Sequence, residues 1–369
     1  MSTQPVIDMC LSARVIVTCG TGGVGKTSVA AALGFEIAQQ GKRAIVITID
    51  PARRLADAIG LGEGTGNEIQ RVPLDATGEL WVTMLDVQET FDSLVRDTSP
   101  TPERAKEVMD NSFYRSLSRS LSGTRDYMAA ERLYDLCEDE RFDVIIVDTP
   151  PSRNALDFLE SPERLARFLK HPIVKFMVAP SRGGFRLVNA AMQPVFKAIS
   201  TVVGGDTLTG TAAFLRAFDG MEEEFSRRAL VVADTLRSSV SSFVIVTAPS
   251  PDALTEANHF VSELSRLGIS LRLIVANRMP PHFGTLTATE EHSMAQSQSG
   301  DLARVHELIA GLHDDADRAD SDIQAFIQRT STAFPTVSTA FATELATDIH
   351  DMDSIGALAQ QLAAPPTQQ

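Results

Sequence analysis

Short, continuous apolar runs alternate along this chain with longer segments of helical pattern. The runs are rich in β-branched residues and lack polar alternation, which is typical of parallel strands covered on both faces. We expect strands at 14–19, 43–50, 81–85, 142–148, 243–248, 271–276 and 336–339. Alternating strands and helices predict an α/β fold with a doubly wound, mostly parallel sheet.

The segments between these runs differ in character. Residues 26–39 are alanine-rich and apolar on most faces, so they predict a buried helix, and residues 251–267 place their apolar positions on one face. Residues 87–138 and 154–240 also have helical patterns, and the second stretch is too long for a single crossover helix. Residues 284–300 are small and polar, which predicts a mobile loop.

A phosphate-binding motif follows the first expected strand and precedes the first expected helix. The sequence GTGGVGKT at 20–27 matches GxxxxGK[ST] in the context that this motif requires. Its glycines allow consecutive backbone N–H groups to face phosphate oxygens, and the helix N-terminus adds partial positive charge. We expect Lys26 to contact the β- and γ-phosphates of ATP and the Thr27 hydroxyl to bind Mg²⁺.

Two aspartates end other expected strands. Asp148 stands at the carboxyl end of 142–148, the edge of a doubly wound sheet that faces the ligand, where an acidic residue can hold the water shell of Mg²⁺. Asp50 ends 43–50 and has two interpretations: it orients and deprotonates an attacking water, or it caps a helix over 52–59. The residues alone do not decide between them.

These motifs set the expected organisation of one domain over 1–369. The nucleotide-binding core is expected at 12–86, 140–153, 241–283 and 330–363. A helical subdomain is expected to enter it from two places, 87–139 and 154–240, and 364–369 is expected to be a disordered tail. The segment 158–196 is dense in Phe, Leu and Met, so it forms either an ordinary core or a surface for an apolar helical client.

Charge and cysteine content narrow the function classes. The formal net charge is −15, and the most basic stretch, 96–132, interleaves its cations with carboxylates, so we interpret it as a solvated helical face and exclude nucleic-acid binding. The three cysteines are scattered, which argues for a reducing compartment and against disulfides or structural zinc. With no secretion signal and no apolar run of about 18 residues, we expect a cytoplasmic protein without a membrane span.

Five stretches together resemble the ArsA-type arsenite-pump and tail-anchored-protein-targeting ATPase family. They are CGTGGVGKTSVAAALG, ITIDPARRLADAIG, VIIVDTPPSRNALDFL, VTAPSPDALTEANHFVSELSRLGI and LIVANR. TDIHDMDSIGAL near the C-terminus is also similar, so the resemblance covers nearly the whole chain. It is greatest to the actinobacterial branch, whose members carry the DPARRLA and DTPPSRNALDFL forms.

The resemblance implies roles for individual residues. It implies phosphate binding by Gly20, Thr21, Gly22, Gly23, Val24, Gly25, Lys26, Thr27 and Ser28. It also implies Mg²⁺ binding by Thr27 and Asp148, water activation by Asp50, a second switch that begins at Thr149, and adenine binding by Asn277. Members belong to the dimeric class of P-loop NTPases with a deviant Walker A motif, in which two nucleotides lie face to face.

This sequence departs from the family pattern at several positions. The signature lysine of the loop is Thr21 here, which favours a heterodimer with a related ATPase that keeps its lysine over a homodimer helped by Arg53 or Arg153. The zinc-binding CxxC and the metalloid-binding cysteine cluster have no counterparts, so we do not expect arsenite activation.

Three functions remain open from the sequence. The leading hypothesis is an ATPase whose hydrolysis drives a helical subdomain between open and closed dimers. The alternative is a nucleotide-binding structural subunit that hydrolyses little ATP itself. The third is a chromosome- or cell-division-positioning ATPase, which the large segment between Asp148 and Asn277 disfavours because such proteins are usually shorter.

Overall fold

The computed structural model describes residues 5–50, 67–111, 122–150, 221–284, 286–345 and 347–364, together with positions 55, 59, 114 and 167. The chain divides into two compact units. Unit 1 comprises Met1–Met84, Glu140–Leu156 and Leu236–Gln369, and unit 2 comprises Leu85–Asp139 and Asp157–Thr235. None of the described helices is long and apolar enough to cross a membrane.

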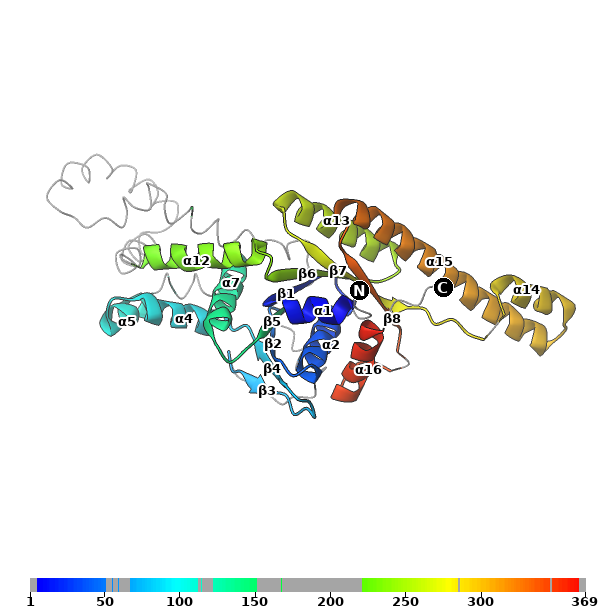
Figure 1. Ribbon diagram of the computed structural model, residues 1–369, viewed down its shortest axis with the longest axis horizontal. Helices are drawn as coiled ribbons and strands as arrows, with labels where there is room; N and C mark the ends of the chain where they lie inside the picture. Colours follow the sequence, from blue (N-terminus) through cyan, green and yellow to red (C-terminus); the bar gives the residue numbers. More distant parts are fainter. Residues whose placement is uncertain are drawn as a thin grey trace, which may run out of the picture. The chain divides into compact units, whose positions relative to one another are not determined.

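The described part of unit 1 is built on one eight-stranded sheet in the order β3-β4-β2-β5-β1-β6-β7-β8 (Figure 1). The strand bounds are β1 Val15–Cys19, β2 Arg43–Thr48, β3 Gln70–Arg71, β4 Glu79–Met84, β5 Val144–Asp148, β6 Ser241–Thr247, β7 Leu271–Met279 and β8 Ser338–Thr343. All neighbours pair in parallel except β3 and β4. The predicted doubly wound, mostly parallel sheet is confirmed, and the two-residue β3 is an addition to it.

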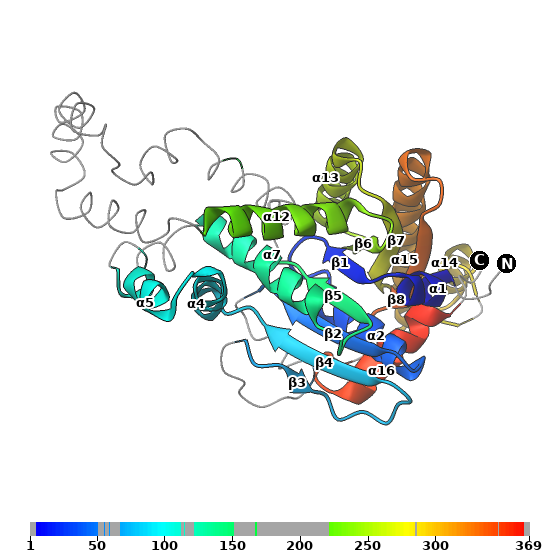
Figure 2. The same cartoon turned by 60° about the vertical axis from the view of Figure 1, so that its left-hand side comes forward.

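Helices cover both faces of this sheet, with α2 and α16 on one side and α13 and α15 on the other (Figure 2). The helix bounds in unit 1 are α1 Pro5–Ser12, α2 Lys26–Gln39, α13 Pro251–Leu267, α14 Ala288–Ser297, α15 Asp301–Ala333 and α16 Met352–Ala363. Helix α2 lies so close to the sheet that a Cβ on Gly34 would stand 2.8 Å from Leu80 Cδ1. This close packing fixes the helix that begins at Lys26 against the strands that frame the phosphate loop.

The segment 284–300 is not the predicted mobile loop. It contains α14, which begins with a capping box in which Thr287 Oγ1 accepts a hydrogen bond from the Glu290 amide and the Glu290 carboxylate accepts one from the Thr287 amide. Thr at one position and Glu three residues later is a helix-start signal, but polar composition outweighed it in the sequence analysis. Helix α15, 33 residues long, occupies a segment in which no helix or strand was expected.

Helices α14 and α15 are joined by histidine–carboxylate pairs. His306 Nδ1 lies 2.6 Å from Glu291 Oε2, and His292 Nε2 lies 3.1 Å from Asp314 Oδ2. The hydrogen bond to Asp314 raises the pKa of exposed His292 above its usual value. We call this helical hairpin, residues 288–333, the arm.

The described part of unit 2 is helical. It contains α4 Val87–Thr98, α5 Pro102–Asp110, α7 Ser122–Glu138 and α12 Glu222–Arg237, packed around a core that includes Phe91, Tyr127 and Phe225. The apolar segment 158–196 lies outside the described residues except for Arg167, as does the tail after Ala364.

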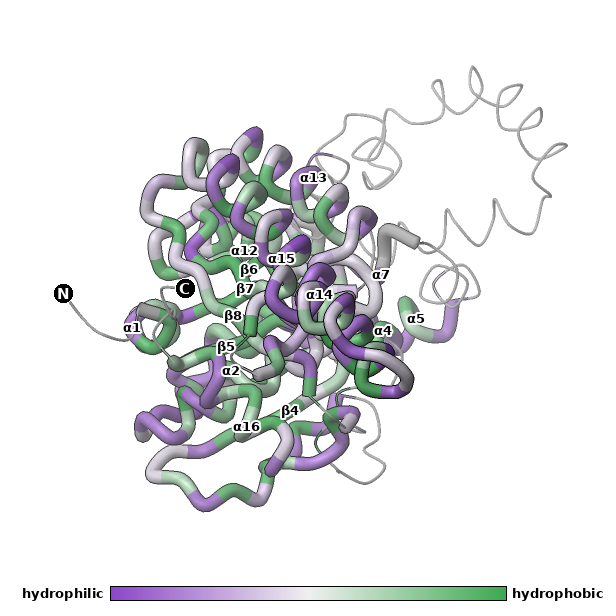
Figure 3. The backbone as a smooth tube through the Cα atoms, turned by 90° about the vertical axis from the view of Figure 1, so that its right-hand side faces the viewer, coloured by the Kyte–Doolittle hydropathy of each residue, from purple (hydrophilic) through white to green (hydrophobic). Residues whose placement is uncertain are grey.

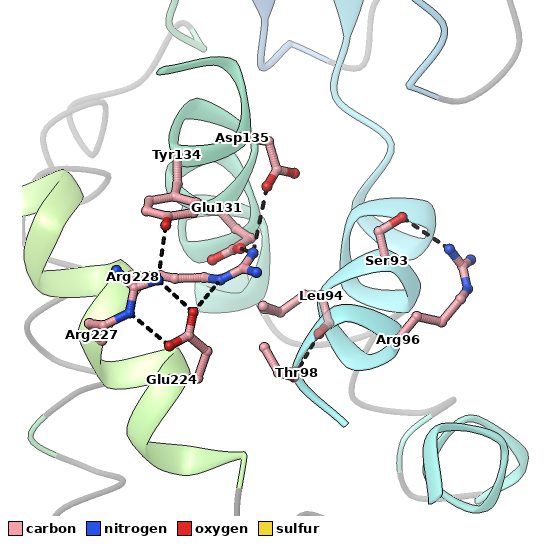
Figure 4. Close-up of polar contacts among 10 residues, drawn as sticks. All are labelled: Ser93, Leu94, Arg96, Thr98, Glu131, Tyr134, Asp135, Glu224, Arg227 and Arg228. Carbon is pink, nitrogen blue, oxygen red and sulfur yellow. Dashed lines mark hydrogen bonds and ion pairs between the residues drawn. The ribbon is translucent and has the colours of Figure 1, made fainter. Parts of the chain in front are cut away.

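A cluster of charges around the buried Glu131 joins α7 to α12 (Figure 4). The Arg228 guanidinium lies 2.6 Å from Glu131 Oε1, 3.1 Å from Glu224 Oε1 and 3.6 Å from Asp135 Oδ1. Glu131 is only 2% exposed, and burial raises the pKa of its carboxyl to about 7. The interpretation of 96–132 as a solvated face was therefore wrong at Glu131, which is buried with a partner 97 residues away in sequence.

We expect Arg228→Met to destabilise the protein strongly. The substitution removes the cation that faces three carboxylates, so the free energy of unfolding should fall by about 3–5 kcal/mol at pH 8. Glu131→Gln should cost only about 1 kcal/mol, because the amide oxygen still accepts from Arg228 and Glu224 still pairs with the guanidinium. Urea unfolding followed by circular dichroism measures both losses.

The loss in Arg228→Met should also depend on pH. Burial raises the folded-state pKa of Glu131 to about 7, above the ordinary glutamate value of 4.5. The stability contributed by the protonated carboxyl is therefore fully present below about pH 4.5 and is lost as pH rises through about 7. Lowering the pH from 8 to 6 should therefore restore part of the stability of the variant. Arg266→Met, which breaks an exposed pair with Glu263, is the control and should change stability by less than about 1 kcal/mol. Equal losses for Arg228→Met and Arg266→Met would contradict the assignment of the cluster.

Candidate functional site

The phosphate loop connects the end of β1 to the start of α2. Gly20, Gly23 and Gly25 have φ angles of 153°, 83° and 90°, which favour glycine. A Cβ on Gly20 would collide with the Val246 carbonyl oxygen, and one on Gly25 with the side-chain amide of Asn277. Helix α2 has no side-chain cap, so the N–H groups of its first turn remain available to an anion in the loop.

Lys26, the first residue of α2, is 6% exposed and lines the cavity at the loop. Its Nζ donates a hydrogen bond of 2.9 Å to the carbonyl oxygen of Thr21, across the loop. The loop backbone thus holds the ammonium group at the cavity.

Asp148 ends β5, which lies between β1 and β2 in the sheet. Its Oδ2 accepts hydrogen bonds from the hydroxyls of Thr27 at 2.8 Å and Thr48 at 3.0 Å. Its Oδ1 is buried and has no hydrogen-bond partner in the described structure. Burial raises the pKa of the carboxyl to about 6, although the two threonine hydroxyls and nearby Lys26 lower it. A buried carboxylate oxygen without a partner, beside a threonine hydroxyl, fits a hydrated divalent cation.

Asp50 lines the same cavity just after β2. Its backbone amide donates a hydrogen bond to Thr48 Oγ1 at 3.3 Å. Thr48, whose hydroxyl also donates to Asp148, therefore holds the backbone at Asp50. Most of the segment 51–66 lies outside the described residues, and with it the helix cap considered above. Thr149, which follows Asp148, donates to the Thr18 carbonyl oxygen at 2.6 Å and so fixes the start of the segment after β5.

Asn277 binds the phosphate loop from β7. It is 7% exposed, and its Nδ2 donates a 2.8 Å hydrogen bond to the Val24 carbonyl oxygen. Arg278, next to it, has a φ of 57°, unusual for a residue other than glycine, where the pairing of β7 with β8 shifts register. Asn277 is thus placed at the cavity, and its amide N–H group is engaged by the loop.

The cavity has a volume of about 550 Å³ and brings together most of the predicted site residues. It is lined by Gly23, Gly25, Lys26, Thr27, Ser28, Asp50, Thr149, Asn277, Arg278, Thr343, Glu344, Leu345, Thr347, Asp348, Ile349, His350 and Leu358. Gly20, Thr21, Gly22, Val24 and Asp148 belong to the loop or the strand end and are not in its lining. The sequence did not predict that residues between 343 and 350 line the cavity. They overlap TDIHDMDSIGAL, a stretch that resembles the family but to which no role was assigned.

None of the three cysteines is among the residues that line this cavity. Cys10 is in α1, Cys19 ends β1 and Cys137 is in α7. Burial raises the pKa of both the Cys10 and the Cys19 thiols to about 12, so both behave as small apolar side chains.

Comparisons with known proteins identify relatives of this chain. The profile of the anion-transporting ATPases matches residues 13–316. A putative arsenical pump-driving ATPase 1 of Aquifex aeolicus is 22% identical over 278 residues, covering 73% of this chain and 64% of the relative. ATPase GET3 of Malassezia globosa is 23% identical over 280 residues, covering 75% of this chain and 76% of the relative.

An uncharacterized protein of Streptomyces coelicolor is 28% identical over 273 residues, covering 73% of this chain and 63% of the relative. The chain thus spans slightly less than two thirds of the Aquifex and Streptomyces proteins. The resemblance expected from the sequence is confirmed. Because the profile match covers most of its length, the chain belongs to the anion-transporting ATPase family of P-loop ATPases.

Proposed function

We propose that this protein binds ATP with Mg²⁺ and hydrolyses it at the cavity beside the phosphate loop. The observation that carries the proposal is the position of Asp148, which binds the Thr27 hydroxyl through Oδ2 and keeps Oδ1 buried without a partner. A carboxylate of this kind is stabilised when a cation completes its surroundings.

Each part of the cavity has a distinct task in this proposal. Residues 20–28 hold the phosphates, and Lys26 exchanges its contact with the Thr21 carbonyl oxygen for phosphate oxygens. Thr27 and Asp148 would hold Mg²⁺, the latter through water, and the ion would supply positive charge beside the phosphates. Asp50 orients and deprotonates the attacking water, and Asn277 both supports the loop and faces the nucleotide.

We further propose that the active form is a dimer whose turnover moves the helical unit, and that a related ATPase is the second subunit. Support comes from Thr21, which has no charge with which to reach a facing nucleotide. The Lys and Arg side chains that line the described cavity are Lys26 and Arg278. Arg53 and Arg153, the alternative cations of a homodimer, lie outside the described residues. An apolar helical client remains proposed for segment 158–196 from its sequence alone.

Hydrolysis by the isolated chain tests these proposals. Wild-type protein should release phosphate from ATP slowly and only with Mg²⁺, and Thr21→Lys should raise the rate by at least about tenfold, because the added ammonium supplies charge in the transition state. Thr255→Lys, an exposed threonine on α13, is the matched control and should not change the rate. Phosphate release under single-turnover and steady-state conditions measures all three proteins.

The outcomes separate the alternatives. ATP binding without hydrolysis in both wild type and Thr21→Lys would favour the nucleotide-binding structural subunit. A fast wild-type enzyme that needs no second protein would contradict the heterodimer and leave the ATPase proposal intact.

A further inference from the structure

Exposed large apolar side chains concentrate on one part of the described structure. Of the ten that are exposed there, seven lie between positions 283 and 312, namely Phe283, Leu286, Met294, Leu302, Val305, Leu308 and Leu312. Single exposed apolar residues are ordinary, but a concentration of them marks a surface that a partner covers.

The apolar positions of α15 follow a heptad pattern along the whole helix. Alternating steps of three and four connect Leu302, Val305, Ile309, Leu312, Ala316, Ala319, Ile323 and Phe326. In the C-terminal half, this face is buried: Ala319 and Ile323 pack with Ala276 and Met279 of β7. In the N-terminal half, the same face is open, with Leu302 60%, Val305 49% and Leu312 48% exposed.

We call this face the seam, formed by the exposed Leu302, Val305 and Leu312 and the half-buried Ile309. It lies where α15 extends past the sheet, as Figure 1 shows, and Figure 3 views the arm with its free end toward the reader. Helix α14 does not cover the seam, because it packs on a neighbouring side of α15 that carries His306 and Asp314. The two histidine–carboxylate pairs that join the hairpin therefore do not involve the seam.

We propose that the seam binds a helix of another protein that has its own heptad apolar face and Lys or Arg beside it. Steps of three and four are the spacing that seats the side chains of a second helix. The seam and its flanks span residues 301–315, about 22 Å of helix at about 1.5 Å per residue, enough for two heptads of a partner.

The negative charge of the arm predicts which side chains flank the apolar face of the partner helix. Residues 288–333 contain nine Asp or Glu against three Arg and no Lys, a formal charge of −6 with histidines neutral. Asp301 and Asp315 hold the heptad positions directly before Leu302 and Ala316, where interhelical ion pairs form in coiled coils. A second copy of this chain would bring like charges together, whereas Lys or Arg on a partner pairs with these carboxylates.

A synthetic helix tests the seam in the full chain. The probe is a 21-residue peptide of about three heptads with Ile and Leu at the apolar positions and Lys at the flanking ones, and the control peptide has Glu there. The lysines also keep the probe from pairing with itself. Fluorescence anisotropy should show that the Lys peptide binds at least about tenfold more tightly than the Glu peptide, with an affinity that falls as salt rises.

Variants assign the binding to the seam. Val305→Asn with Leu312→Asn should weaken binding of the Lys peptide at least about tenfold, because two contacts in the interface lose apolar area. Leu230→Asn with Val231→Asn, similarly exposed at 39% and 38% on α12, is the matched control and should bind like wild type. Circular dichroism verifies that both variants fold, as expected for exposed positions.

Two results would overturn the proposal. One is equal affinity of the Lys and Glu peptides, or equal affinity of the wild type and the seam variant for the Lys peptide. The other is a dimer of the isolated chain in sedimentation experiments that becomes a monomer in the seam variant, which would make a second copy the occupant. Neither result depends on ATP hydrolysis, so the proposed function is tested separately.

Discussion

Asp50→Asn is expected to bind ATP with nearly wild-type affinity and to hydrolyse it about 10²–10⁴ times more slowly, the range associated with loss of a general base. Asp50 lines the cavity after β2, and its backbone amide is held by the Thr48 hydroxyl that also binds Asp148. Asparagine keeps the size and one oxygen of the side chain but cannot take a proton. An interaction used mainly in the transition state affects the rate more than the affinity.

Single-turnover hydrolysis and calorimetric titration with ATP measure the two quantities in the same preparation. Asp75→Asn, an exposed aspartate outside the cavity lining, is the control and should match wild type in both. If Asp50→Asn folds but no longer binds ATP, Asp50 is a ligand of the nucleotide or of Mg²⁺. If it instead loses about 1 kcal/mol of stability with its hydrolysis unchanged, the helix-cap interpretation is correct.

The sheet could be predicted because parallel strands leave a direct trace in the sequence. Strands β1 and β5 are buried at every position, so they appear as unbroken apolar runs. Strand β8 is less regular, with small and partly exposed residues, and its expected place covered only its beginning. Strand β3 has two residues and one antiparallel partner, too little for a pattern to detect.

The candidate site was predicted where a motif encodes backbone geometry and missed where only the fold brings residues together. The glycines of the loop specify their own conformations, so Gly20 to Thr27 could be recognised directly. The contact of Thr48 with Asp148 depends on the register of β2 against β5, where these two residues are paired. Nothing in the run 43–50 distinguishes that threonine from one that faces a helix.

Charged and polar segments were the least predictable. Glu131 has the same sequence surroundings as an exposed helical glutamate, and only Arg228, on another helix, makes its burial possible. The polar composition of 284–300 indicated a loop. Some of these polar residues pair with residues on α15, and the sequence spacing does not reveal those pairs. In both segments the partner that stabilises a charge is distant in sequence, and at 284–300 the polar composition also outweighed the capping box.

Lys26→Ala is expected to lower the affinity for ATP with Mg²⁺ by at least about 100-fold, since it removes charge-assisted contacts to two phosphates. The side chain is 6% exposed at the cavity and is held there by the Thr21 carbonyl oxygen, so little ordering is needed before it can bind phosphate. Removing Lys26 should also disfavour the charged form of Asp148 at the cation site, because Lys26 lowers the pKa of that carboxyl.

In the absence of nucleotide, Lys26→Ala should reduce the stability of the protein by only about 1 kcal/mol, the contribution of one hydrogen bond. Lys26→Ala is therefore expected to reduce the free energy of ATP binding more than the free energy of unfolding. Calorimetry at pH 7.5 measures the first quantity, and urea unfolding measures the second. Lys42→Ala, an exposed lysine that follows α2, is the matched control for loss of a positive charge and should bind ATP like wild type. Equal ATP affinity in Lys26→Ala and wild type would show that the phosphates bind elsewhere, because no uncharged side chain can replace an ammonium group at this position.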